Sequence, residues 1–119
     1  MRVLLVDDEV ELVSTLAERL SIRGIDADWV TNAEDALRSA EIQTYDLALL
    51  DVKIPKISGL ELKKILQVKC PGMKLIFLTG HGSDEDYKAG TAEAGTAYYL
   101  VKPVNIEVLI KKMSEVLKG

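Results

Sequence analysis

The feature of this sequence that most constrains its fold is a regular alternation of short apolar runs with segments of helical period. In the helical segments, most clearly at residues 12–20 and 106–117, apolar side chains return every three or four residues. The apolar runs have strand length and fall at residues 2–6, 26–30, 46–50, 74–78 and 97–101. Strands that alternate with helices predict a parallel sheet with right-handed crossovers and helices on both faces.

Residues suited to helix ends mark the limits of five predicted helices. Gly24 follows the first helix as a C′ residue, and Asn105 is placed to cap the last one. The fourth helix, at residues 83–95, is rich in Ala and contains Gly90, which makes it the weakest of the five. Pairs with the spacing of a capping box begin the second, third and fourth helices: Asn32 with Asp35, Ser58 with Glu61, and Ser83 with Asp86.

The length and charge of the chain narrow the classes of protein to consider. The 119 residues suffice for one domain, which we place at residues 1–119. The net charge of -4 argues against a nucleic-acid surface, and Lys63, Lys64 and Lys69 are interpreted as a solvated helix face. The single Cys70 permits no internal disulfide and no zinc-ligand spacing is present. Without a secretory signal or a membrane-length apolar run, a cytoplasmic protein is expected.

Polar residues follow four of the five predicted strands. In the flavodoxin-like, doubly wound (βα)5 fold with strand order 2-1-3-4-5, those four strands are neighbours, and ligands bind at their carboxyl ends. Thr79 offers a hydroxyl there, and Gly80 offers a backbone N–H that permits close approach because glycine has no Cβ. We therefore expect these residues to converge at one edge of the sheet: Asp7 and Asp8, Asp51, Thr79 and Gly80, and Lys102 with Pro103.

Three carboxylates at one sheet edge repel one another unless a cation neutralises them. Oxygen ligands without nearby His or Cys favour a hard ion, and Mg²⁺ (or Mn²⁺) needs only one or two carboxylates plus a phosphate oxygen. Three aspartates, one Mg²⁺ and Lys102 sum to zero, so both cations can absorb the charge of an acyl phosphate. Asp51 stands alone on its strand and is the expected nucleophile, whereas the adjacent Asp7 and Asp8 are better placed to share the metal.

Taken together in this order and spacing, the motifs at the strand ends resemble the receiver domain of two-component response regulators. The resemblance covers the whole chain. The matching segments are LLVDDE with Asp7 and Asp8, LLDVKIPKISGLEL with Asp51, Pro55 and Gly59, LTGHG with Thr79 and Gly80, and YYLVKP with Tyr99, Lys102 and Pro103. The resemblance implies that Asp51 accepts a phosphoryl group from the phosphohistidine of a sensor histidine kinase.

The same resemblance implies a role for each residue of the site. Asp8, Asp51 and the backbone carbonyl of Lys53 would bind Mg²⁺ directly, and Asp7 would act largely through water. The other implied roles are phosphoryl binding by Thr79, Gly80 and Lys102, a switch pair of Thr79 and Tyr99, a cis peptide bond at Lys102–Pro103, and rate modulation by Lys53 and His81.

The resemblance also implies how the signal leaves the domain. Phosphorylation would reshape the surface of the fourth helix, fifth strand and fifth helix, which would contact a downstream effector domain or form a homodimer. We expect a phosphoacceptor signalling domain rather than an enzyme, without direct nucleic-acid or membrane binding. Glu9 is interpreted only as a helix-start acid, which the helix dipole favours.

Two alternative functions stay open. The first is a receiver-like module that binds partners without being phosphorylated. The second is a flavodoxin-type cofactor binder, which shares the predicted architecture but needs a hydroxyl- and glycine-rich phosphate loop after the first strand. At that position this chain has DDE.

Overall fold

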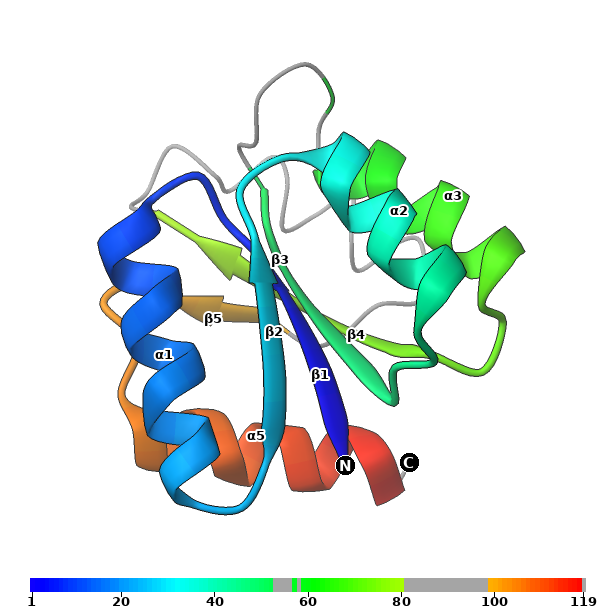
Figure 1. The fold of residues 1–119 in the computed structure, drawn as a ribbon. Helices are drawn as coiled ribbons and strands as arrows, with labels where there is room; N and C mark the ends of the chain where they lie inside the picture. Colours follow the sequence, from blue (N-terminus) through cyan, green and yellow to red (C-terminus); the bar gives the residue numbers. More distant parts are fainter. Residues whose placement is uncertain (53–56, 58, 81–98, 119) are drawn as a thin grey trace.

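The computed structural model describes residues 1–52, 57, 59–80 and 99–118. Its five strands form one sheet in the order β2-β1-β3-β4-β5, and every neighbouring pair is parallel (Figure 1). The strands are β1 (Arg2–Val6), β2 (Asp26–Val30), β3 (Leu47–Asp51), β4 (Lys74–Thr79) and β5 (Tyr99–Val101). This order confirms the predicted topology.

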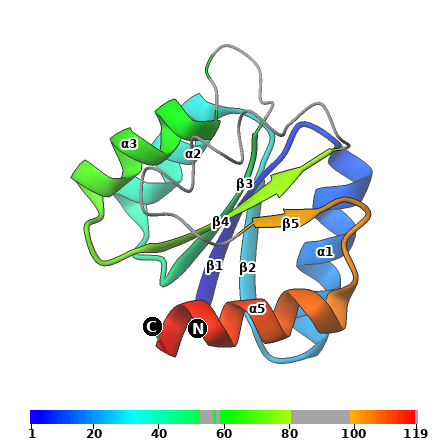
Figure 2. The ribbon, with the colours of Figure 1, turned by 180° about the vertical axis from the view of Figure 1, so that it is seen from behind.

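Helices cover both faces of the sheet. The helices are α1 (Val10–Ile22), α2 (Ala33–Ile42), α3 (Gly59–Lys69) and α5 (Ile106–Lys118). Seen from the front and from behind, α1 and α5 lie on one face, while α2 and α3 lie on the other (Figures 1 and 2). The helix predicted at residues 83–95 lies outside the described residues, as do the predicted caps Ser58 and Ser83.

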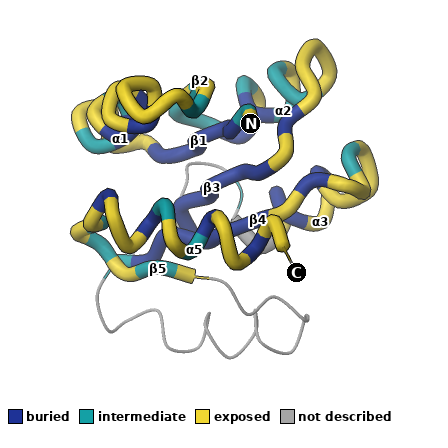
Figure 3. The backbone as a smooth tube through the Cα atoms, turned by 90° about the horizontal axis from the view of Figure 1, so that it is seen from below, coloured by how far each residue is buried: buried dark blue, intermediate teal, exposed yellow. Residues whose placement is uncertain are grey.

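Side chains of the central strands alternate between two apolar cores, one on each face of the sheet. In β1, Val3 and Leu5 belong to the core under α1 and α5, whereas Leu4 and Val6 belong to the core under α2 and α3. None of these four residues is more than 1% exposed, as expected for a parallel sheet covered on both faces. Figure 3 shows this burial in the dark blue tubes of β1 and β3, which lie between helices whose outer sides are largely yellow.

Local hydrogen bonds confirm three of the predicted helix ends. Asn32 accepts the N–H of Asp35 through Oδ1 at 2.8 Å, and Asn105 accepts the N–H of Glu107 in the same way at 2.8 Å. Gly24 closes α1 with a φ of 80°, a left-handed conformation that side chains with a Cβ rarely adopt. These bonds fix the residues at which α2 and α5 begin.

Two departures from the sequence-based expectations concern β3 and Lys63. First, β3 begins and ends one residue later than predicted, so Asp51 lies within the strand ladder, with its Cα opposite that of Leu78. Second, Lys63 is only 3% exposed, and burial, followed by repulsion from Lys64, lowers the pKa of its ammonium. The interpretation of a solvated lysine face is therefore wrong at Lys63.

A buried tyrosine near the amino ends of the strands gives the fold a pH dependence. The hydroxyl of Tyr45 donates to Asp28 Oδ2 at 2.7 Å. Burial first, and this hydrogen bond second, raise the pKa of Tyr45 to about 12. Since the pKa of a tyrosine in the unfolded chain is about 10, the folded state holds the phenol proton more tightly. The resulting stability is complete below about pH 10 and is lost as the pH rises towards 12.

We expect the Tyr45→Phe variant to lose about 1 kcal/mol of unfolding free energy at neutral pH, because it lacks the hydrogen bond to Asp28. Between pH 10 and 12 its unfolding free energy should fall less steeply than that of the wild type. Urea denaturation at a series of pH values measures both effects. Equal pH slopes for the two proteins would contradict the assignment of this titration to Tyr45.

Candidate functional site

Four parallel strands deliver polar side chains to one edge of the sheet. Asp7 and Asp8 follow β1, Asp51 ends β3, Thr79 ends β4 and Lys102 follows β5. One carboxylate oxygen from each of the three aspartates lies within 4.8 Å of the other two. Asp7 and Asp51 are buried and Asp8 is exposed, so the cluster opens to solvent on the side of Asp8.

The alternation of side chains along the strands accounts for this convergence. Asp7, Asp51 and Lys102 each stand two positions after a leucine that packs in or against the core under α1 and α5. Because residues two apart on a strand share a face, the three charged groups are directed to the same side of the sheet edge. The apolar pattern of the strands thus fixes where the charges lie.

Both carboxylate oxygens of Asp7 have a partner. The backbone N–H of Asp7 donates to the carbonyl of Val30 at 3.2 Å, which ties the residue to the end of β2. Its Oδ1 accepts the N–H of Glu9 at 2.9 Å, and its Oδ2 lies 2.8 Å from the ammonium of Lys102. The Asp7 side chain is therefore held in one orientation, with a single oxygen directed towards the charged cluster.

Lys102 is the cation of the site. Its backbone N–H donates to the carbonyl of Thr79 at 2.8 Å, and the peptide bond that joins it to Pro103 is cis. Its ammonium lies 2.8 Å from Asp7 Oδ2 and 3.4 Å from Asp51 Oδ2. Burial alone would lower the pKa of Lys102, but the hydrogen bonds and charges of the surrounding carboxylates raise it above its usual range. Lys102 is therefore charged at any physiological pH.

Glu9 is the residue of the site that sequence reasoning missed. It is the N-cap residue of α1, yet its side chain makes no capping hydrogen bond. Its Oε1 instead lies 2.8 Å from the Lys102 ammonium, so the interpretation of Glu9 as a helix-start acid alone is wrong. Three carboxylates, those of Asp7, Glu9 and Asp51, therefore share the Lys102 ammonium, and adding Glu9 to the charge balance predicted for three aspartates leaves one negative charge uncompensated.

Thr79 adds a hydroxyl to this edge of the sheet. The residue is fully buried, and among the described residues its Oγ1 has no hydrogen-bond partner. A buried hydroxyl without a hydrogen-bond partner is costly, so a ligand that accepts a hydrogen bond from Thr79 fits the site. Gly80 follows Thr79 directly and is half-buried.

Tyr99 lies on the same face of the sheet as Thr79. In the β4–β5 ladder, Tyr99 pairs with Phe77 and Val101 pairs with Thr79, so these side chains share the face that carries α2 and α3. Tyr99 is 38% exposed and therefore forms part of the surface. Lys53 and His81, for which rate-modulating roles are predicted, lie outside the described residues, and so does Tyr98.

The donor set of the cluster is suited to a hard divalent cation. Asp7, Asp8 and Asp51 supply only carboxylate oxygens, and the Asp8 side is open to solvent, which leaves room for water ligands. The site therefore combines carboxylates that could hold a metal or act as a nucleophile, the ammonium of Lys102 and, among the described residues, a hydroxyl without a hydrogen-bond partner. This set of groups is suited to binding and accepting a phosphoryl group.

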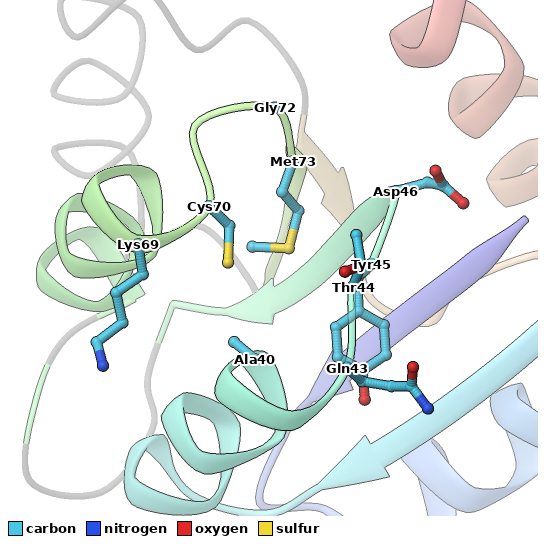
Figure 4. A pocket seen from close by; sticks show the side chains of 9 residues that line it. All are labelled: Ala40, Gln43, Thr44, Tyr45, Asp46, Lys69, Cys70, Gly72 and Met73. Carbon is cyan, nitrogen blue, oxygen red and sulfur yellow. The ribbon is translucent and has the colours of Figure 1, made fainter.

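A pocket at the opposite edge of the sheet is separate from this site. Figure 4 shows it between the end of α2, the segment that leads into β3, and the turn between α3 and β4. Its lining includes Tyr45, Cys70 and Met73. Asp46 also lines it and precedes β3, whereas Asp51 ends that strand, so the length of β3 separates the pocket from the acidic cluster.

Comparison with curated proteins identifies the family. The response regulator receiver domain model matches residues 3–114. The chain is 35% identical to a CpxR homologue of Haemophilus influenzae, a transcriptional regulatory protein, over 98% of the chain and 50% of that relative. It is also 35% identical to the two-component response regulator PhoP of Pseudomonas aeruginosa, over 99% of the chain and 52% of the relative. The chain thus spans about half the length of these relatives.

Solved structures agree with this match. A CheY-like response regulator receiver domain protein from Methanospirillum hungatei has a TM-score of 0.89 and 32% identity, and the match covers 98% of this chain and 93% of that one. NtrX from Brucella abortus has a TM-score of 0.90 at 24% identity, over 98% of this chain and 27% of that one, and supports the fold. Fold and site together define a signalling domain of the two-component class. The chain belongs to the response regulator receiver domain family.

None of the described helices is both long enough and apolar enough to cross a bilayer.

We expect the Lys102→Met variant to be less stable than the wild type by about 3 kcal/mol in the presence of a chelator, because Asp7 would be left as a buried charge without a cation. Lys111→Met, which removes an exposed lysine of α5, is the matched control and should change stability by less than about 0.5 kcal/mol. Urea denaturation measures both variants. Equal stability of Lys102→Met and the control would contradict this role of Lys102.

Proposed function

We propose that Asp51 accepts a phosphoryl group from the phosphohistidine of a sensor histidine kinase, and that the acyl phosphate changes an output surface of the domain. The observation that carries this proposal is the convergence of Asp7, Asp8, Asp51 and Lys102 at one edge of the sheet. Membership of the receiver domain family supports this class of reaction, and the position of each side chain suggests its role in the reaction.

In the proposed reaction, a carboxylate oxygen of Asp51 attacks the phosphorus of the phosphohistidine. A new P–O bond forms and the P–N bond breaks, while its electron pair returns to the imidazole, which takes a proton from water. Asp51 is suited to this role because it ends the central strand β3, where the ladder fixes its backbone beside β4. Asp51 as a whole residue is only 5% exposed, and this burial limits competing reactions of its carboxylate with solvent.

Asp7, Asp8 and Asp51 would hold Mg²⁺ (or Mn²⁺), together with the backbone carbonyl of Lys53, which lies outside the described residues. When bound, such an ion offsets the negative charge that gathers between the carboxylates and the phosphoryl oxygens. Lys102 would move its ammonium from Asp7 towards the new phosphoryl oxygens. Its present distance of 3.4 Å from Asp51 Oδ2 makes this a short displacement.

Thr79 would donate its hydroxyl to the phosphoryl group, and Gly80 would donate its backbone N–H. A charge-assisted hydrogen bond contributes about 1.5–3 kcal/mol of binding free energy. Shifting a two-state conformational equilibrium from 1:99 to 99:1 requires about 5.5 kcal/mol of differential binding free energy. Thr79 alone is therefore insufficient and would act with Lys102 and the metal. Movement of Thr79 would make space for Tyr99, which lies on the same face of the sheet.

The proposed output surface consists of the helix predicted at residues 83–95, β5 and α5. Two exposed residues of β5, Tyr99 and Val101, and the exposed Val108 of α5 provide apolar area on the described part of this surface. The transcriptional regulators similar to this chain are about twice its length. A downstream effector domain, or a second copy of the receiver, is the proposed partner of the surface.

The experiment that tests the proposed function is intact-mass analysis after incubation with acetyl phosphate. Wild-type protein should gain one phosphoryl group in the presence of Mg²⁺ and lose most of this reactivity when the metal is chelated. Asp51→Asn should gain none under either condition, because an amide is not a phosphoryl acceptor. A wild type that is never phosphorylated would support the alternative of a binding module, and equal labelling of both proteins would reject Asp51.

The Thr79→Ala variant separates phosphorylation from switching. We expect it to be phosphorylated, because Asp51 and the candidate metal ligands are intact, but to lose most of the change in amide hydrogen exchange of β5 and α5 that acetyl phosphate produces in the wild type. Thr44→Ala removes an exposed hydroxyl before β3, at the opposite edge of the sheet, and serves as the control. A full exchange response in Thr79→Ala would refute the coupling.

A further inference from the structure

The ammonium of Lys102 has a carboxylate partner outside the aspartate cluster. Glu9 Oε1 lies 2.8 Å from Nζ, as close as Asp7 Oδ2 and closer than Asp51 Oδ2 at 3.4 Å. Glu9 does not belong to the group of three carboxylates that lie within 4.8 Å of one another. The ammonium therefore lies closer to Glu9 and Asp7 than to the carboxylate of Asp51.

The side chain of Glu9 is committed to this contact. Glu9 occupies the N-cap position of α1, where the shorter Asp, Asn, Ser or Thr is preferred as a cap, and its side chain makes no capping hydrogen bond that would compete with Lys102. Its carboxylate is 60% exposed, while the side chain of Lys102 is only 14% exposed. Glu9 thus approaches the lysine from the solvent side and leaves the aspartate cluster on the other side.

We infer that Glu9 is a positioning residue that holds the Lys102 ammonium beside the start of α1, so that Asp7 and Asp51 stay accessible to a divalent cation until a phosphoryl group draws the lysine away. This inference rests on the proposed function and deepens it, because it assigns a regulatory contact to the same site. Glu9 acts only through Lys102 and touches neither the metal nor the phosphoryl group.

The contact has opposite consequences for the two ligands of the site. Without the Glu9 carboxylate, Lys102 is left with Asp7 and Asp51 as partners, so a divalent cation meets stronger competition for their oxygens. A phosphoryl group, in contrast, no longer has to draw Lys102 from Glu9. Loss of the contact therefore weakens binding of Mg²⁺ and strengthens binding of a phosphoryl analogue. Each change is expected to be about two- to fivefold, the range of a partly exposed ion pair.

Two substitutions at Glu9 distinguish contact from charge. Glu9→Gln removes the charge, and Glu9→Asp keeps it on a shorter side chain that is well suited to cap α1 instead of reaching Lys102. The matched control is Glu11→Gln, which removes an acid from the exposed first turn of the same helix. If the contact with Lys102 matters, Glu9→Asp behaves like Glu9→Gln. If only the overall charge matters, Glu11→Gln behaves like Glu9→Gln, and Glu9→Asp behaves like the wild type.

The decisive measurement is a double-mutant cycle on the Mg²⁺ dissociation constant, determined by isothermal titration calorimetry without any phosphoryl donor. Glu9→Gln is expected to weaken Mg²⁺ binding about two- to fivefold in the wild-type background and to have only the effect of Glu11→Gln in the Lys102→Met background. The same Glu9 variants, saturated with Mg²⁺, are expected to bind fluoroberyllate about two- to fivefold more tightly. Additive effects in the cycle, or a wild type that does not bind Mg²⁺, overturn the inference. If Asp51 is not phosphorylated but the Glu9 and Lys102 substitutions are coupled in the cycle, the proposed function is rejected and the inference about Glu9 stands.

Discussion

Lys102 brings one ammonium group within 2.8 Å of both Asp7 and Glu9 and within 3.4 Å of Asp51, at the point where three strands of the sheet end. Carboxylates so close together would otherwise repel one another in a largely buried setting. The lysine therefore keeps the cluster together, and the ends of β1, β3 and β5 depend on it. The proposed chemistry depends on the same lysine, because a phosphoryl group would compete with these carboxylates for its charge.

The rest of the fold serves to position this cluster. The core strands bury nearly all of their side chains on both faces, which leaves the chain no freedom to slide in register, since a shift of one residue would exchange the two faces. The aspartates and the lysine are placed by that register, while Thr79 stands on the opposite face beside the row that carries Tyr99. Binding on one side and the proposed readout on the other are thus joined through β4, which neighbours β3 and Asp51, and through β5 beside it.

The parts that could be predicted from the sequence are those set by local pattern. Apolar runs and caps identify the described strands and helices because burial and capping act over a few residues. Their alternation indicates a parallel sheet, whereas the strand order 2-1-3-4-5 is that of the flavodoxin-like fold, which the resemblance implies. The convergence of Asp7, Asp51 and Lys102 also follows, because parallel strands end at one edge. Lys63 and Glu9 are the residues for which local pattern gives the wrong interpretation, because Lys63 is buried in the folded domain and Glu9 contacts Lys102. In the sequence, Glu9 has the position of an ordinary acid at the start of a helix, and nothing near it indicates contact with a lysine 93 residues later.

The central claim is that the carboxylate of Asp51, and no other carboxylate of the cluster, carries the phosphoryl group. Acyl phosphates are reduced by borohydride, so treatment of the acetyl phosphate reaction with borohydride, followed by peptide mass mapping, identifies the modified residue directly. The account predicts one modified position, Asp51, and none in protein treated with borohydride alone. Modification at Asp7 or Asp8, or at no residue of this cluster, would contradict it.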